Sequence, residues 1–112
     1  MQLDEILDAC AAFPAVELGY PFGEEVAVFK VVGRMFAAVG VSGERPLLTL
    51  KSDPEDARAL VSEFEDVTAG YHMNKKHWIS IAVPSRGAPV EELIAASYDL
   101  VVAGLPRAKR PR

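Results

Sequence analysis

The side chains of this sequence that could do chemistry are concentrated between Gly70 and Trp78, which reads Gly-Tyr-His-Met-Asn-Lys-Lys-His-Trp. This segment contains both histidines of the chain, its only tryptophan and two adjacent lysines. Lysines neutralise phosphates, amides and imidazoles exchange hydrogen bonds with base edges, and aromatic rings stack on bases. The combination indicates a site for a nucleic acid or another anion.

The predicted site combines this segment with basic residues on three expected strands, which extend it if they share one face. The predicted nucleic-acid or anion contacts are His72, Asn74, Lys75, Lys76, His77, Lys30, Arg34 and Lys51. The aromatic residues expected to support them are Tyr20, Phe22, Tyr71 and Trp78. Trp78 is expected to brace the site from beneath, because an alternating strand that buries it turns His77 to the opposite face. Asn74 is equally suited to form a turn.

Two classes of ligand fit these residues. If the ligand is DNA, Lys75 and Lys76 neutralise phosphates while His72 and Asn74 donate hydrogen bonds. The alternative is a protein partner, or a small molecule bearing a carboxylate or phosphate, in a pocket formed together with the Tyr20-Pro21-Phe22-Gly23 loop. A concave pocket beside His72 and Lys75 would favour the small ligand, and a flat positive face would not.

The sequence predicts no catalytic, metal or cofactor site. Cys10 lies on an apolar helical stripe with no base near it in the sequence. His72 and His77 match no standard zinc spacing, and the acids of the first helix are typical of a helix N-terminus at the surface. No glycine-rich phosphate loop precedes a helix. We therefore expect a non-enzymatic binding module.

Length and composition limit the remaining possibilities. The chain has 112 residues, half of them hydrophobic, and a formal net charge of −4, which suits one domain with one core. A single cysteine excludes an internal disulfide, and neither a signal peptide nor a membrane span is visible. We therefore expect a cytoplasmic location, and we assume a monomer because the sequence does not specify the oligomeric state. Residues 1–29 contain no Lys or Arg, and residues 67–112 are basic, so DNA binding would be weak and salt-sensitive.

The first half of the chain predicts one helix and three strands. Apolar residues at helical spacing from Leu3 predict a helix, which must end before Pro14. Residues 16–25 are expected to form a loop, because two glycines and a proline surround two aromatic rings. Strands are expected at 26–31, 34–41 and 47–51, and tight turns join them into an antiparallel meander.

The second half predicts a central helix, a fourth strand and a last helix. Asp53 is expected to cap the central helix, Pro54 to begin it, and residues 65–66 to end it. A connection over 67–76 then leads to a strand over 77–83.

The last helix is delimited by two residues that favour its ends. Pro89 is expected at its first position, and Gly104 is expected to end it in a left-handed conformation. A single domain over 1–106 and a flexible basic tail at 107–112 follow. The expected order is α-β-β-β-α-β-α, an α+β fold with helices packed on an antiparallel sheet made of the meander and one further strand.

Several short motifs resemble the MmcQ/YjbR family, in the same order and along nearly the whole chain. They are Tyr20-Pro21-Phe22-Gly23, Phe29-Lys30, Met35-Phe36-Ala37, Leu50-Lys51, Asp53-Pro54-Glu55, the segment from Gly70 to Trp78, Ser97-Tyr98 and Leu105-Pro106. The resemblance implies a CyaY-like α+β fold with a "double-wing" arrangement and a predicted DNA-binding role. Because a shared fold does not imply a shared function, the site residues must carry the functional argument.

Overall fold

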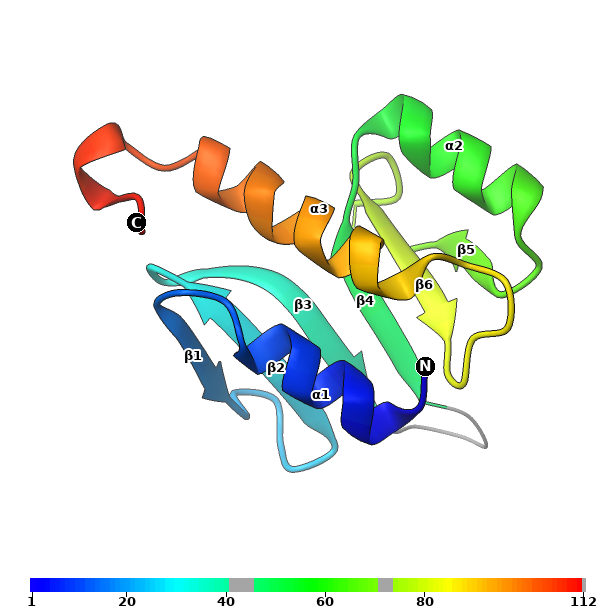
Figure 1. The fold of residues 1–112 in the computed structure, drawn as a ribbon, viewed down its shortest axis with the longest axis horizontal. Helices are drawn as coiled ribbons and strands as arrows, with labels where there is room; N and C mark the ends of the chain where they lie inside the picture. The colour runs from blue at the N-terminus through cyan, green and yellow to red at the C-terminus, as the bar shows by residue number, and fades with distance from the viewer. Residues whose placement is uncertain (41–45, 71–73, 112) are drawn as a thin grey trace.

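Three α-helices cover one face of a six-stranded antiparallel sheet in the computed structural model, which describes residues 1–40, 46–70 and 74–111 (Figure 1). The helices are α1 (Leu3–Ala11), α2 (Pro54–Glu63) and α3 (Val90–Ala103), and a short 3-10 helix, η1 (Arg107–Lys109), follows α3. The strands are β1 (Val16–Gly19), β2 (Val26–Val31), β3 (Arg34–Gly40), β4 (Leu47–Lys51), β5 (Val67–Ala69) and β6 (Trp78–Ala82). Their order across the sheet is β1-β2-β3-β4-β6-β5.

The α+β class and the antiparallel sheet are confirmed, but the sheet contains two strands that the sequence did not predict. β1 lies within the expected loop 16–25, and β5 lies within the expected connection 67–76. Both are edge strands, of 4 and 3 residues respectively. Strands this short show too little alternation of buried and exposed residues to be recognised. The observed order is therefore α-β-β-β-β-α-β-β-α.

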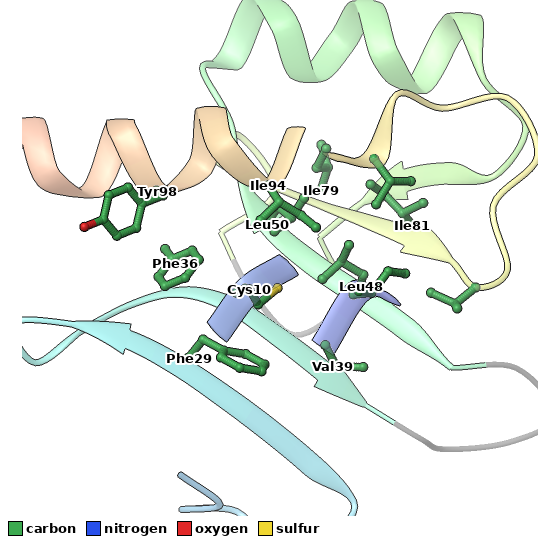
Figure 2. Close-up of a cluster of buried hydrophobic side chains, with 14 of the residues drawn as sticks. Cys10, Phe29, Phe36, Val39, Leu48, Leu50, Ile79, Ile81, Ile94 and Tyr98 are labelled. Atoms are coloured by element: carbon green, nitrogen blue, oxygen red, sulfur yellow. The ribbon is translucent and has the colours of Figure 1, made fainter. Parts of the chain in front are cut away.

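The hydrophobic core lies between the helices and the sheet face that they cover (Figure 2). The strand register places Phe29, Ala37, Leu50 and Ile79 side by side across β2, β3, β4 and β6. Ile94 of α3 belongs to the same fully buried cluster. Burying a leucine- or phenylalanine-sized side chain stabilises a fold by about 1.5–3 kcal/mol, so this layer of side chains contributes much of the stability.

Two hydroxyls of α3 attach the helix to the rest of the molecule. Ser97 Oγ donates to the Phe36 carbonyl at 2.6 Å and accepts from the Lys51 N–H at 2.8 Å. These are backbone groups just beyond the point where the pairing of β3 with β4 ends. The Tyr98 hydroxyl donates to the Pro14 carbonyl at 2.6 Å. Both hydroxyls thus provide hydrogen-bond partners for backbone groups that lie outside the pairing of β3 with β4.

The ends of the helices follow the predicted signals only in part. Asp53 caps α2 by accepting the Glu55 N–H at 2.9 Å, and Pro54 is the first helical residue, as predicted. The helix ends at Glu63, before the expected 65–66. Pro89 precedes the first residue of α3 instead of occupying that position. Gly104 has φ −82°, so the prediction of a left-handed cap there was wrong.

The chain beyond α3 continues as η1 and is bonded back to the helix end. Arg110 Nε donates to the Leu105 carbonyl at 3.0 Å, and its Nη2 donates to the Ala103 carbonyl at 2.9 Å. A guanidinium at this position satisfies carbonyls that a helix C-terminus leaves free. None of the helices in the described residues is long and apolar enough to cross a membrane.

Candidate anion-binding site

The segment from Gly70 to Trp78 connects β5 to β6 at the edge of the sheet. The Gly70 N–H donates to the Trp78 carbonyl at 2.8 Å, which closes the base of the connection. A Cβ built on Gly70 would lie 2.6 Å from the Trp78 Cβ, so any larger residue at this position would push the end of β5 away from the start of β6. Tyr71, His72 and Met73 lie outside the described residues, and the roles predicted for Tyr71 and His72 stay predictions.

The residues just before β6 form a tight turn around Asn74. Its Oδ1 accepts the Lys76 N–H at 3.0 Å, and its carbonyl accepts the His77 N–H at 3.1 Å. The His77 carbonyl in turn accepts the Ser52 N–H at 2.8 Å, which ties the turn to the start of α2. Of the two roles considered for Asn74, the structure thus shows the turn, and Lys75 and Lys76 project from it as exposed residues.

A hollow of about 620 Å³ separates this turn from α2. Its lining residues come from α2, from the end of β5 and from the turn: Pro54, Ala57, Arg58, Val61, Ser62, Ala69, Lys75 and Lys76. The α2 residues are spaced at three and four positions, so they form one face of the helix. We call this feature the cationic hollow, because three of its lining residues are basic and none is acidic.

The three cations of the cationic hollow have no partner among the described residues. The side chains of Arg58, Lys75 and Lys76 make no hydrogen bond or ion pair within the ranges that the structure describes. The walls between them are apolar, from Pro54 and from Val61, which is 42 % exposed. An unpaired arginine fork with two lysines around an apolar surface suits an anion that also carries an apolar part.

Arg58 was not among the residues predicted from the sequence. Its spacing from Pro54 and Ser62 is visible in the sequence as four residues in each direction, which puts them on one line along the helix. These α2 residues form a candidate site only because the turn with Lys75 and Lys76 lies on the other side of the hollow. No local signal in the sequence links α2 to this turn.

The other predicted basic residues do not lie at the cationic hollow. Lys30 and Lys51 alternate with the buried Phe29 and Leu50, so they point to the sheet face without helices. Arg34 lies elsewhere, since a Cβ built on Gly104 at the end of α3 would be 3.8 Å from its Nη1. None of the three strand residues therefore extends the site: Lys30 and Lys51 share the helix-free face of the sheet, and Arg34 lies near the end of α3.

The predicted supporting aromatic residues are also separated. Trp78 is half-buried and pairs in register with Lys51 on the helix-free face. Tyr20 and Phe22 follow β1, at the sheet edge opposite to β5, and they are 53 % and 77 % exposed. Tyr20 lines a different hollow of about 390 Å³. The Tyr20-Pro21-Phe22-Gly23 loop thus forms no common pocket with Lys75 and Lys76.

Cys10, the only cysteine, is an apolar core residue. Its side chain is fully buried on α1 (Figure 2). Burial raises the pKa of its thiol from 9.0 to about 12, because desolvation disfavours the thiolate. The thiol is therefore protonated at neutral pH, and no cluster of potential metal ligands occurs among the described residues.

Comparisons with known proteins find the same architecture and the same family. The family model described as YjbR matches residues 11–100. The chain is 40 % identical over 101 residues to the uncharacterized protein YbdF of Escherichia coli O157:H7, covering 88 % of this chain and 83 % of that protein. It is 32 % identical over 112 residues to the uncharacterized protein YjbR of Escherichia coli K12, covering 98 % and 95 %.

Solved structures extend the comparison to the fold. The crystal structure of a Deinococcus radiodurans protein with a DUF419 domain superposes with a TM-score of 0.86 at 32 % identity, covering 97 % of this chain and 85 % of that one. The structure of a Pseudomonas syringae protein gives a TM-score of 0.75 at 23 % identity, covering 89 % and 98 %. The second likeness concerns the fold alone.

Proposed function

This chain belongs to the YjbR family, and from that premise we propose that it is a binding module for a small molecule bearing a phosphate or carboxylate. The ligand would occupy the cationic hollow. The observation that carries this proposal is that Arg58, Lys75 and Lys76, from two separate elements, line one concave space without a carboxylate. A concave space beside Lys75 is the feature expected for a small ligand, as opposed to a flat face.

The three cations would have different roles in holding the anion. Arg58 lies on a helix, and its planar fork donates two parallel hydrogen bonds to a carboxylate or phosphate. Lys75 and Lys76 supply mobile point charges from the turn that Asn74 holds in shape. The apolar part of the ligand would cover Pro54 and Val61, which removes apolar surface from water.

Isothermal titration calorimetry with inorganic pyrophosphate and with citrate tests this proposal. We expect saturable binding of at least one probe, weakened about tenfold by Arg58→Gln and by the double variant Lys75→Gln/Lys76→Gln. Arg86→Gln is the matched control, because Arg86 is exposed and lies outside the lining of the cationic hollow. Equal affinities of all these variants, or no binding of either probe, would contradict the proposal.

DNA is a second candidate ligand for the same turn. The distribution of charge supports it, because Arg58 is the only Lys or Arg within α1, α2 and α3, so the other lysines and arginines lie outside these three helices. If duplex DNA binds, its affinity must fall steeply as salt rises, and the Lys75→Gln/Lys76→Gln change must reduce that slope by about two phosphate contacts. If the protein binds pyrophosphate but does not bind DNA at low salt, the small anionic ligand remains as the only candidate of the two.

The proposed function involves no catalysis. The single thiol is buried with a raised pKa, and the turn supplies cations and an amide whose oxygen is already bonded to the backbone. These groups hold an anion and provide no activated nucleophile. Incubation with a phosphate monoester such as p-nitrophenyl phosphate should therefore release no product above the rate of the buffer.

A further inference from the structure

Besides the cationic hollow, α2 borders another hollow on its other side, between this helix and α3. It measures about 220 Å³. Leu60 of α2 and Leu93 and Leu100 of α3 line it, and Ile79 of β6 lies at its bottom. Leu100 is 38 % exposed, although the opposite side of α3 is buried in the core. We call this feature the α2–α3 groove.

The charged residues around the α2–α3 groove are mainly acidic. Asp53 and Asp56 line it and are exposed. Lys51 also lines it, but alternation with the buried Leu50 directs its side chain to the helix-free face of the sheet. Arg58 lines the cationic hollow instead. Two of the three charged residues that line this groove are therefore acidic, whereas all three charged residues that line the cationic hollow on the opposite side of α2 are basic.

We propose that the α2–α3 groove docks a cationic peptide segment of a partner protein. A leucine-sized side chain of the partner would enter the groove between Leu60 and Leu93, and a neighbouring Lys or Arg would pair with Asp53 or Asp56. Charge complementarity selects this occupant, because an apolar floor with an acidic rim matches an apolar residue flanked by cations. A gap between two helices is also the shape that receives an amphipathic helix.

Neither the helix N-termini nor the basic tail of a second copy of this chain matches the α2–α3 groove. Its helices present the same acidic first turns on α1, α2 and α3, so docking one helical face on another brings like charges together. Its basic tail at 107–112 has the charge but lacks a leucine-sized side chain. We therefore assign the groove to a segment of a different protein that combines both features.

Fluorescence anisotropy with synthetic peptides tests this proposal on the full chain. The probe is a labelled 14-residue peptide of leucine and lysine, with leucines at helical spacing. One comparison peptide carries glutamate in place of lysine, and another keeps the lysines but carries serine in place of leucine. We expect only the leucine-lysine peptide to bind, because both the apolar contact and the positive charge are required.

Variants that leave the net charge unchanged separate the α2–α3 groove from general attraction to an acidic protein. Ala96 of α3 is exposed and lines the groove, so Ala96→Phe fills it and should weaken the peptide about tenfold or more. Ala103→Phe is the matched control, since Ala103 is also exposed on α3 but does not line the groove. Circular dichroism of both variants verifies that they fold.

Neutralising the rim tests the charge part of the proposal. Asp56→Asn should weaken the leucine-lysine peptide, whereas Asp8→Asn on α1 removes the same charge away from the groove and should leave it unchanged. Equal binding to Ala96→Phe and Ala103→Phe would overturn the proposal. So would equal binding of the serine-lysine peptide, which would reveal attraction by net charge alone.

Discussion

α2 and α3 lie on the same face of the sheet, but they are packed on it very differently. α3 buries five residues, Val90, Ile94, Ser97, Tyr98 and Val101, whereas Ala57 is the only buried residue of α2. Hollows flank α2 on both sides, with cations on one side and carboxylates on the other. The comparison separates a helix that packs into the core from a helix that has a hollow on each side.

The physical reason for this difference lies in side-chain size and position. α3 lies over the centre of the sheet, where β2, β3 and β4 present Phe29, Phe36 and Leu50 to it. α2 lies over β5 and β6, near the sheet edge, and contacts it through an alanine and the half-buried Leu60. A thin contact at an edge leaves space that larger side chains would have filled.

The largest effect on stability is expected at the centre of α3. Ile94→Ala removes a fully buried side chain and should lower the free energy of unfolding by about 2–5 kcal/mol. Leu60→Ala in α2 should cost clearly less, because Leu60 is only half-buried. Urea denaturation of both variants measures the difference. Equal losses would mean that the two helices are packed equally well.

A smaller loss is expected from the hydroxyl that joins α3 to the sheet. Ser97→Ala leaves the Phe36 carbonyl and the Lys51 N–H without their partner, which should cost about 1–3 kcal/mol. Ser62→Ala in α2 is the control, because Ser62 is exposed and should change stability by no more than about 0.5 kcal/mol. A Ser97→Ala protein as stable as the wild type would show that these bonds are not needed.

High pH should also destabilise the helix layer. The folded state holds the Cys10 thiol protonated up to about pH 12, whereas the unfolded chain releases the proton near 9.0. The contribution of Cys10 to the free energy of unfolding is thus fully present below pH 9. It decreases above pH 9, at a rate that approaches about 1.4 kcal/mol per pH unit. Cys10→Ala should reduce this slope in denaturation measured from pH 7 to 10.5.

Tyr98 adds to the same pH dependence from α3. Burial first, and then the neighbouring Asp99, raise the pKa of its phenol above 10.0. Because the protonated form is favoured in the folded state, its contribution is also lost as pH rises above 10. Tyr98→Phe therefore serves as a second variant, and a slope unchanged in both Cys10→Ala and Tyr98→Phe would contradict the assignment.

The smallest effect on stability is expected at the cationic hollow. The side chains of Lys75 and Lys76 are exposed and make no hydrogen bond or ion pair among the described residues, so Lys75→Gln/Lys76→Gln should change the free energy of unfolding by no more than about 0.5 kcal/mol. The same variant should lose most of its affinity for pyrophosphate. A large loss of stability would instead place these lysines among the residues that hold the turn together.

Much of the fold could be predicted because its signals are local. The strand alternation from residue 26 to 51, the cap at Asp53 with Pro54, and the inner face of α3 each depend on residues close together in the chain. β1 and β5 were missed because short edge strands acquire their structure from a neighbour. Gly104 was misjudged because a glycine after a helix permits a left-handed cap without requiring one.

The candidate site was only half visible from the sequence. The cluster of Asn74, Lys75 and Lys76 is contiguous, so its chemistry could be recognised directly. Arg58 comes sixteen or more residues earlier, on a helix whose orientation no local pattern specifies. Lys30 and Lys51 were grouped with this cluster by charge alone, although strand alternation turns them to the other face of the sheet.

The sequence by itself determined the α+β class, the family and the chemistry of the turn, because period, capping and motif are properties of neighbouring residues. Tertiary structure alone decided that Arg58 lines the same hollow as Lys75 and Lys76, and that Asp53 and Asp56 line one groove together with leucines of α3. These arrangements depend on how α2 packs on the sheet, and that packing is determined by side chains that are far apart in the chain.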